Sequence, residues 1–193
     1  NSGMIMQENV DELVEPFRHK NDTWSWSTEF IGKWMLGAMD MYRYNGDPAL
    51  LEKISKGIHD LTATQEPDGY IGNYAPGKRL QAWDIWGRKY TALALISYYR
   101  LTGEKPVLEA AAKSIDCLIN DLNERNTDIA KTGNYFGMAS CSVLEPVVYL
   151  YKETGCRKYL DFALSIVESI EREGSSQLIT KALNGVPVSQ RSA

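Results

Sequence analysis

Apolar residues recur every three to four positions in seven segments of the chain, which is the spacing of one face of an α-helix. The predicted helices cover residues 4–17, 29–44, 50–64, 83–101, 107–122, 140–153 and 159–172, with a partial helix over 175–183. No segment alternates apolar and polar residues in the manner of a strand. The pattern therefore predicts an all-α protein with seven or eight helices.

One phrase occurs three times and predicts how the helices are joined. Its copies span residues 41–51, 98–108 and 150–160. In each copy a Tyr and a basic residue close an apolar run, and Gly46, Gly103 or Gly155 follows three residues after the basic one. Glycine adopts the left-handed conformation that ends a helix, and Pro48 and Pro106 suit the first turn of the next. The copies lie 57 and then 52 residues apart, a period that predicts an array of helical hairpins.

The opposite turn of each hairpin is long. Residues 65–77 hold two Pro and three Gly, which exclude a helix, and residues 123–136 form a second polar segment. Long ordered loops are disproportionately functional. If the hairpins stack side by side, these loops fall on one face, and an (α/α) toroid presents its cleft on such a face. The sequence predicts one domain over residues 1–193, a partial (α/α) six-hairpin toroid of three to four hairpins.

Close packing is also expected inside the helix over residues 29–44. Gly32 and Gly37 lie within its apolar stripe. Because glycine lowers helix stability, two of them in one helix indicate that a neighbouring helix approaches closely there.

Composition narrows the choice of partners. The 193 residues carry a net charge of −4, which favours neither nucleic acid nor an anionic membrane surface. Cys117, Cys141 and Cys156 have no metal-like spacing, and we expect three free thiols in the core. Neither His19 nor His59 has sequence neighbours that would make a metal or nucleophile site. The localisation stays open between the bacterial cytoplasm and the periplasm.

Aromatic and acidic residues suggest a site for carbohydrate. Trp24 and Trp26, with Glu29 behind them, precede the second predicted helix. Aromatic rings match the apolar faces of sugars, and a carboxylate accepts hydrogen bonds from hydroxyl groups. A sugar-stacking platform explains the cluster, and so does a hydrophobic staple at the helix start. In the first long loop, Asp68 and Tyr70 either form an ordinary turn or point into the cleft.

Two further groups lie where helices begin. Asp84, Trp86 and Arg88 open the helix over residues 83–101, either as a cap and core or as residues that contact a ligand. Ser140 stands near the start of a later helix, and Glu145 in the first turn of that helix is explained by the helix dipole alone. The candidate substrate-binding residues are Trp24, Trp26, Glu29, Asp68, Tyr70, Asp84, Trp86, Arg88 and Ser140.

The loop over residues 65–72, the segment 83–90 and the third hairpin together resemble a known family. From residue 24 to 170 the chain is similar to the N-terminal part of the β-L-arabinofuranosidase-type glycoside hydrolases. That resemblance implies a six-hairpin (α/α) barrel and retaining hydrolysis of arabinofuranosides by a cysteine nucleophile beside zinc. These motifs belong to the second half of the family's barrel. The resemblance therefore assigns no catalytic residue and no cofactor to this chain, and zinc only to a full-length parent.

The resulting hypothesis is that the chain forms one wall of a sugar cleft in a glycoside hydrolase and has no activity alone. Two alternatives stay open, a non-enzymatic glycan-binding or scaffold module and a lyase or epimerase that acts on uronates. Arg79, Arg88 and Lys89 give the uronate alternative a basic clamp. The expected partner is an oligosaccharide, and uncovered helix faces predict self-association.

Overall fold

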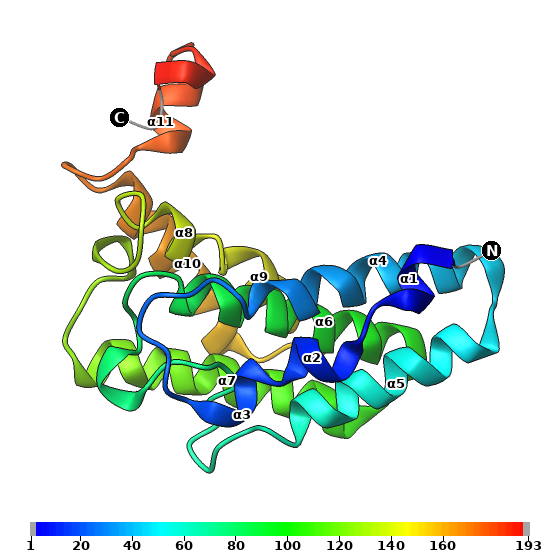
Figure 1. The fold of residues 1–193 in the computed structure, drawn as a ribbon. Coiled ribbons are helices and arrows are strands. Elements are labelled where there is room, and N and C mark those ends of the chain that lie inside the picture. The colour runs from blue at the N-terminus through cyan, green and yellow to red at the C-terminus, as the bar shows by residue number, and fades with distance from the viewer. Residues whose placement is uncertain (1–2, 191–193) are drawn as a thin grey trace.

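The computed structural model describes residues 3–190, and three helical hairpins form its body (Figure 1). The hairpins are α4 (Glu29–Asn45) with α5 (Pro48–Thr62), α6 (Asp84–Thr102) with α7 (Lys105–Glu124), and α9 (Leu144–Thr154) with α10 (Arg157–Glu171). The short helices are α1 (Gly3–Gln7), α2 (Val10–Val14), α3 (Pro16–His19), α8 (Met138–Cys141) and α11 (Leu178–Leu183). Single 3-10 turns cover Pro76–Lys78, Ile129–Lys131 and Val188–Gln190.

The all-α prediction is confirmed over this part of the chain. Residues 3–190 contain no strand, only one isolated backbone pairing between Asp22 and Tyr74. The predicted single domain also included residues 1, 2 and 191–193, which lie outside the described residues.

The three repeated phrases form the tight corners that the sequence predicts. Gly46, Gly103 and Gly155 adopt φ angles of 65°, 76° and 65°. The N–H of each glycine donates to a tyrosine carbonyl four residues earlier, at 2.8, 2.7 and 2.8 Å. The preceding Asn or Thr side chain accepts a hydrogen bond from the backbone N–H two residues on, at Asn45, Thr102 and Thr154. Each corner is thus closed by the same local bonds.

Two predicted helices are interrupted, each for a local reason. The segment 4–17 forms three short helices, because Asn9 caps α2 and Pro16 lacks the N–H that would continue it. The predicted helix over residues 140–153 is interrupted between α8, which ends at Cys141, and α9, which begins at Leu144. Pro146 has no N–H to donate to the carbonyl four residues earlier, so the helical bonding cannot run through this point.

The hairpins are arranged in two rows. α6 packs against both α4 and α9, while α5 and α7 cover the other side of this row. The main core lies between the rows and includes Ile31, Met35, Leu95 and Ile115, all fully buried. α4 and α6 approach closely at Gly32, where an added Cβ would lie 2.5 Å from the Tyr90 carbonyl oxygen.

The expectation of close packing is thus confirmed at Gly32, and it is wrong at Gly37. Nothing lies within 4 Å of a Cβ added at Gly37, because that face of α4 has no neighbouring element there.

The surface of α10 and α11 carries apolar side chains. Leu164 on α10 and Ile179 and Leu183 on α11 are exposed. Self-association through such faces stays a prediction. No helix among residues 3–190 combines the length and the apolar character that a membrane crossing needs.

Candidate functional site

The long loops gather at the end of the hairpins opposite the corners. In Figure 1 this end lies on the left, where the loops that precede α4, α6 and α8 meet. It also presents the N-termini of α4 and α6. We call it the loop end, and the other end the corner end. The sequence prediction that the long loops share one face is confirmed.

A continuous series of aromatic rings crosses the loop end. Neighbouring rings meet edge to face with centroids 5.0 Å apart for Trp24 and Trp26, 6.4 Å for Trp26 and Trp83, and 5.9 Å for Trp83 and Trp86. Tyr90 lies 5.2 Å from Trp86, and Tyr135 lies 5.7 Å from Trp83. We call these six residues the aromatic belt. Trp24 is 61% exposed and Tyr135 is 67% exposed, so rings of the belt remain open to a ligand.

Charged side chains of α4 and α6 border the belt. Glu29, in the first turn of α4, accepts a hydrogen bond from the Trp86 indole N–H and pairs with Lys33 at 2.8 Å. Lys33 and Lys89 lie over the ring of Tyr90, 5.0 and 4.9 Å from its centroid. The belt therefore combines apolar ring faces with a carboxylate and two ammonium groups, which can hydrogen-bond hydroxyl groups around a stacked ring.

The Tyr74 hydroxyl fastens two parts of the belt together. It donates to the Ser25 carbonyl at 2.9 Å and accepts from the backbone N–H of Trp83 at 3.2 Å. Ser25 lies between Trp24 and Trp26, so one buried hydroxyl fixes both tryptophans relative to Trp83. Burial raises the pKa of Tyr74 to about 12, so the hydroxyl keeps its proton and stays a donor.

A buried polar network lies beneath the belt. The Tyr70 hydroxyl donates to Asp84 Oδ1 at 2.7 Å, and the Leu80 N–H donates to Asp84 Oδ2 at 2.8 Å. Arg88 lies 3.0 Å from Asp84 Oδ2 and donates to Asp121 Oδ2 at 2.5 Å. The Arg88 side chain is 1% exposed. We call Tyr70, Arg79, Asp84, Arg88 and Asp121 the arginine network.

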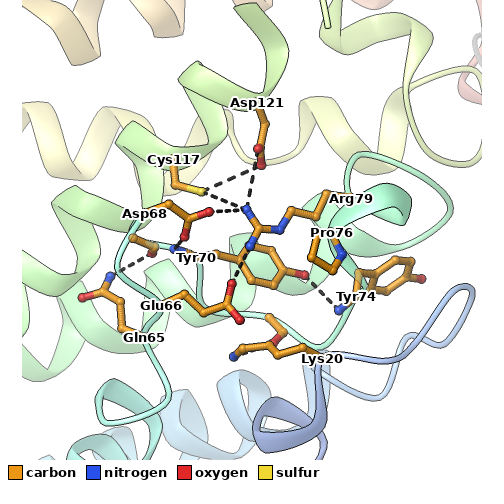
Figure 2. Close-up of polar contacts among 12 residues, drawn as sticks. Lys20, Gln65, Glu66, Asp68, Tyr70, Tyr74, Pro76, Arg79, Cys117 and Asp121 are labelled. Carbon is orange, nitrogen blue, oxygen red and sulfur yellow. Dashed lines mark hydrogen bonds and ion pairs between the residues drawn. The ribbon is translucent and has the colours of Figure 1, made fainter. Parts of the chain in front are cut away.

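Arg79 forms the more open arm of this network (Figure 2). Its two Nη atoms bind Asp68 at 2.5 Å and Glu66 at 2.6 Å. Its guanidinium lies 3.9 Å from the centroid of the Tyr70 ring, and the Arg88 guanidinium lies 4.4 Å from the same centroid. Tyr70 is thus held between two cations, an arrangement that gains energy where water is excluded.

The protonation states follow from this burial. Burial raises the pKa of Tyr70 well above its usual value, and the charge of Asp84 raises it further. Burial would lower the pKa of Arg88, but the carboxylates of Asp84 and Asp121 raise it, so Arg88 stays charged. Burial also raises the pKa of the Cys117 thiol to about 12, so that thiol stays protonated and is a poor nucleophile. The network is a fixed structural frame.

The structure divides the predicted site residues into three groups. Trp24, Trp26, Glu29 and Trp86 lie together at the aromatic belt. Tyr70, Asp84 and Arg88 belong to the arginine network, with Asp68 at its rim. Ser140 is buried apart from both and donates to the Thr132 carbonyl at 3.1 Å.

The structure bears on the alternatives that the sequence left open for two residues. Tyr70 does not point into a cleft, because its fully buried ring lies between two guanidinium groups and its hydroxyl binds Asp84. The Asp84 carboxylate accepts a hydrogen bond from the Leu80 N–H in the preceding loop, and it does not cap the N-terminus of α6. Gln65 holds this loop in place, since its side-chain amide donates to the carbonyls of Gly69 and Ala110, both at 2.9 Å.

Sequence reasoning missed several residues of the site. Trp83, Tyr90 and Lys89 lie in the segment 83–90, which the sequence marks as rich in aromatic and charged residues. No spacing rule distinguished the residues of this segment that face the belt. Lys33 and Tyr135 carried no local signal, because their neighbours in the belt are distant in sequence. Which of these side chains bind a ligand stays a prediction.

The three cysteines do not form a metal site. Cys117 and Cys141 are buried as free thiols, as expected, whereas Cys156 is exposed at the third corner, contrary to expectation. Within residues 3–190 no three His, Cys, Asp or Glu side chains converge in a way that could hold a metal ion. These residues do not fit the zinc that the family resemblance implies for a full-length parent.

Known proteins match the chain at the level of family and fold. A family model described as the β-L-arabinofuranosidase GH127 catalytic domain matches residues 3–177. The non-reducing end β-L-arabinofuranosidase of Bifidobacterium longum subsp. longum is 24% identical over 151 residues, which are 72% of this chain and 22% of that protein. The chain therefore spans about a fifth of this curated relative.

Two solved structures share the fold. The GH127 β-L-arabinofuranosidase of Geobacillus stearothermophilus T6 matches with a TM-score of 0.64 at 20% identity, over 93% of this chain and 30% of that one. A second GH127 β-arabinofuranosidase matches with a TM-score of 0.62 at 18% identity, over 90% of this chain and 30% of that one. The fold is part of an (α/α) toroid, as the sequence predicts.

Proposed function

The chain belongs to the GH127 β-L-arabinofuranosidase family, and on that premise we propose that it forms one wall of the sugar cleft of an arabinofuranoside hydrolase. In this role the chain binds and orients the glycan, and the catalytic groups would lie elsewhere in a longer parent protein. The observation that carries the proposal is the aromatic belt, with exposed rings, a carboxylate and two ammonium groups at the loop end.

The belt has the chemistry that sugar binding needs. Trp24, Trp26 and Tyr135 are exposed, so their rings are available to the C–H faces of a sugar. Lys33 and Lys89 offer donors beside Trp86, where sugar hydroxyl groups would lie. The arginine network beneath keeps the loop and the start of α6 in place, so the belt is formed before a ligand arrives.

The same geometry argues against a catalytic role for the carboxyl groups of this wall. Hydrolysis of a glycoside commonly requires two carboxyl groups placed on either side of the scissile bond. Glu29 is engaged by Lys33 and Trp86, and Asp84 is 2% exposed and saturated with donors. In a zinc-dependent parent, the metal and its cysteine chemistry would come from residues beyond this wall.

One observation weakens the uronate lyase alternative as the sequence framed it. Arg79 and Arg88, two members of its basic clamp, are already neutralised by carboxylates of the chain itself. Their guanidinium groups are therefore not available to an acidic substrate at the belt.

Binding and hydrolysis test the proposal separately. We expect the 193-residue chain to bind a neutral arabino-oligosaccharide with a change in tryptophan fluorescence, and to release no product from an aryl β-L-arabinofuranoside. Trp26→Ala should weaken binding about fivefold or more, since a stacked aromatic ring contributes about 1 kcal/mol beyond its buried area. Tyr44→Ala, which alters an exposed ring at the corner end, is the control and should leave binding unchanged.

Two results would overturn the proposal. Equal binding by the wild-type chain and Trp26→Ala would remove the belt from the sugar site. Robust turnover of the aryl glycoside by the purified chain would show that this wall carries catalytic groups of its own.

A further inference from the structure

A separate cavity of about 420 Å³ opens beside the belt, and its walls are basic. It lies between two loop segments, residues 79–82 and residues 125–133. Arg79, Arg125 and Lys131 contribute to its lining. Its size falls in the range of small-molecule sites in proteins.

Two of these cations have no carboxylate partner in the described part of the chain. Arg125 donates to the Pro76 carbonyl at 2.9 Å, a bond that fixes the guanidinium but leaves its charge uncompensated. Lys131 is exposed and forms no ion pair among residues 3–190. Arg79 is different, because Glu66 and Asp68 already neutralise it.

No acidic side chain of the described residues lines this cavity. Asp128 follows Arg125 along the same loop, but its carboxylate pairs with Arg172 and caps the turn at Ala130. The cavity therefore has an excess of positive charge from Arg125 and Lys131. A ligand with an anionic group would complete the balance that the chain leaves open.

The cavity adjoins the belt through the chain itself. Ala82 and Gly133 line the cavity. Ala82 directly precedes Trp83, and Gly133 stands two residues before Tyr135, and these two rings lie 5.7 Å apart. The cavity and these two rings therefore share the same two loop segments, and a glycan bound at the rings would lie near the cavity.

We propose that this cavity is a subsite for an anionic substituent on a sugar of the bound glycan, either the carboxylate of a uronic acid or a sulfate ester. The inference rests on the proposed function, since the belt must hold the adjoining sugar. It adds a charge preference that the belt does not supply. Arg125 and Lys131 would contact the anion, and Arg79 would form the rigid wall behind them.

The test compares matched glycans on the 193-residue chain. Isothermal titration calorimetry would measure the binding of three oligosaccharides. The first contains galacturonic acid, the second is its carboxyl-reduced neutral counterpart, and the third is that neutral counterpart with a sulfate ester added. We expect at least one acidic glycan to bind about tenfold more tightly than the neutral one, as charge-assisted hydrogen bonds are stronger than neutral ones. The preferred acidic glycan identifies the source of the anion.

Variants then locate the preference. In R125Q/K131Q the preference for the acidic glycan should fall to about threefold or less, while affinity for the neutral glycan stays at the wild-type value. Both side chains are exposed, so the replacement leaves the core intact. Lys105→Gln, which removes an exposed cation at the corner end, is the control and should retain the full preference.

The outcomes separate the two proposals. Neutral and acidic glycans that bind equally, or a preference that survives in R125Q/K131Q, would overturn the anion subsite and leave the sugar wall standing. Absence of binding by every glycan would overturn the sugar wall, and the subsite with it.

Discussion

The corner end and the loop end of the same hairpins are built from opposite kinds of contact. At the corner end, each glycine N–H bonds a carbonyl four residues earlier, and the same bond occurs three times. At the loop end, contacts join residues that are distant in sequence. The Tyr74 hydroxyl reaches Ser25, 49 residues away, and Arg88 reaches Asp121, 33 residues away.

The corner end therefore maintains the regular array of hairpins, whereas the loop end carries the contacts that are particular to this chain. A local turn costs little to form and can be repeated without reference to the rest of the molecule. Buried charges are costly to desolvate, so a network such as that of Arg88 persists only when distant partners are all in place. The loop end is therefore the specific part of the molecule, and the aromatic belt stands on it.

The largest loss of stability is expected from Arg88→Met in the arginine network. Met removes the charge and leaves Asp84 and Asp121 without their shared cation. Loss of one member of a buried ion pair costs about 3–5 kcal/mol, so urea denaturation should show a fall of that size in the free energy of unfolding. Arg157→Met breaks an exposed pair with Asp161 next to the third corner and should cause no measurable change. Similar stability in both variants would contradict the role of the network.

A smaller effect is expected from Gly103→Ala at a corner. Gly103 has φ of 76°, a conformation that costs a residue with a Cβ about 1–2 kcal/mol. An added Cβ meets nothing within 4 Å, so the loss would be conformational alone. Gly37→Ala, which is equally open but lies inside α4, should instead stabilise by up to about 1 kcal/mol. Thermal denaturation measures both, and a loss in both variants would rule out the left-handed corner as the cause.

The smallest effect concerns the open arm of the arginine network. Burial would raise the pKa of Asp68, but the hydrogen bonds from Arg79 and the Tyr70 N–H lower it below its usual value of 3.8. A carboxylate with a lowered pKa in the folded state stabilises above its unfolded pKa, and this contribution is lost as the pH falls through the folded value. Asp68→Asn should therefore be less stable than wild type at pH 7, and the gap should narrow as the pH falls below 3.8.

Chemical denaturation at pH 7 and at a pH below 3.8 measures that gap. Glu109→Gln removes an exposed carboxylate outside the network and serves as the control. A gap for Asp68→Asn that is the same at both pH values would show that its effect does not come from the charge of Asp68.

Some features were predictable because their causes are local. Helix periodicity and the glycine corners predicted the three hairpins and their order, and the same alternation of short and long turns predicted that the loops share an end. The segment 83–90 and the Trp24–Trp26 pair marked the right neighbourhood for a site. Where prediction failed, at residues 4–17 and 140–153, a proline or a cap interrupted an otherwise helical pattern.

The amino-acid sequence by itself thus determined the all-α hairpin array and the ends at which it turns, since each corner is complete within a few residues. Only the tertiary structure decided which polar residues are frame and which are surface. Tyr70, Asp84 and Arg88 belong to the frame because Asp121 and Arg79 converge on them from other segments. Trp24, Trp83 and Tyr135 form one belt only because three loops meet at one end. Partners brought together from distant segments set burial and charge balance, and no local pattern in the sequence encodes them.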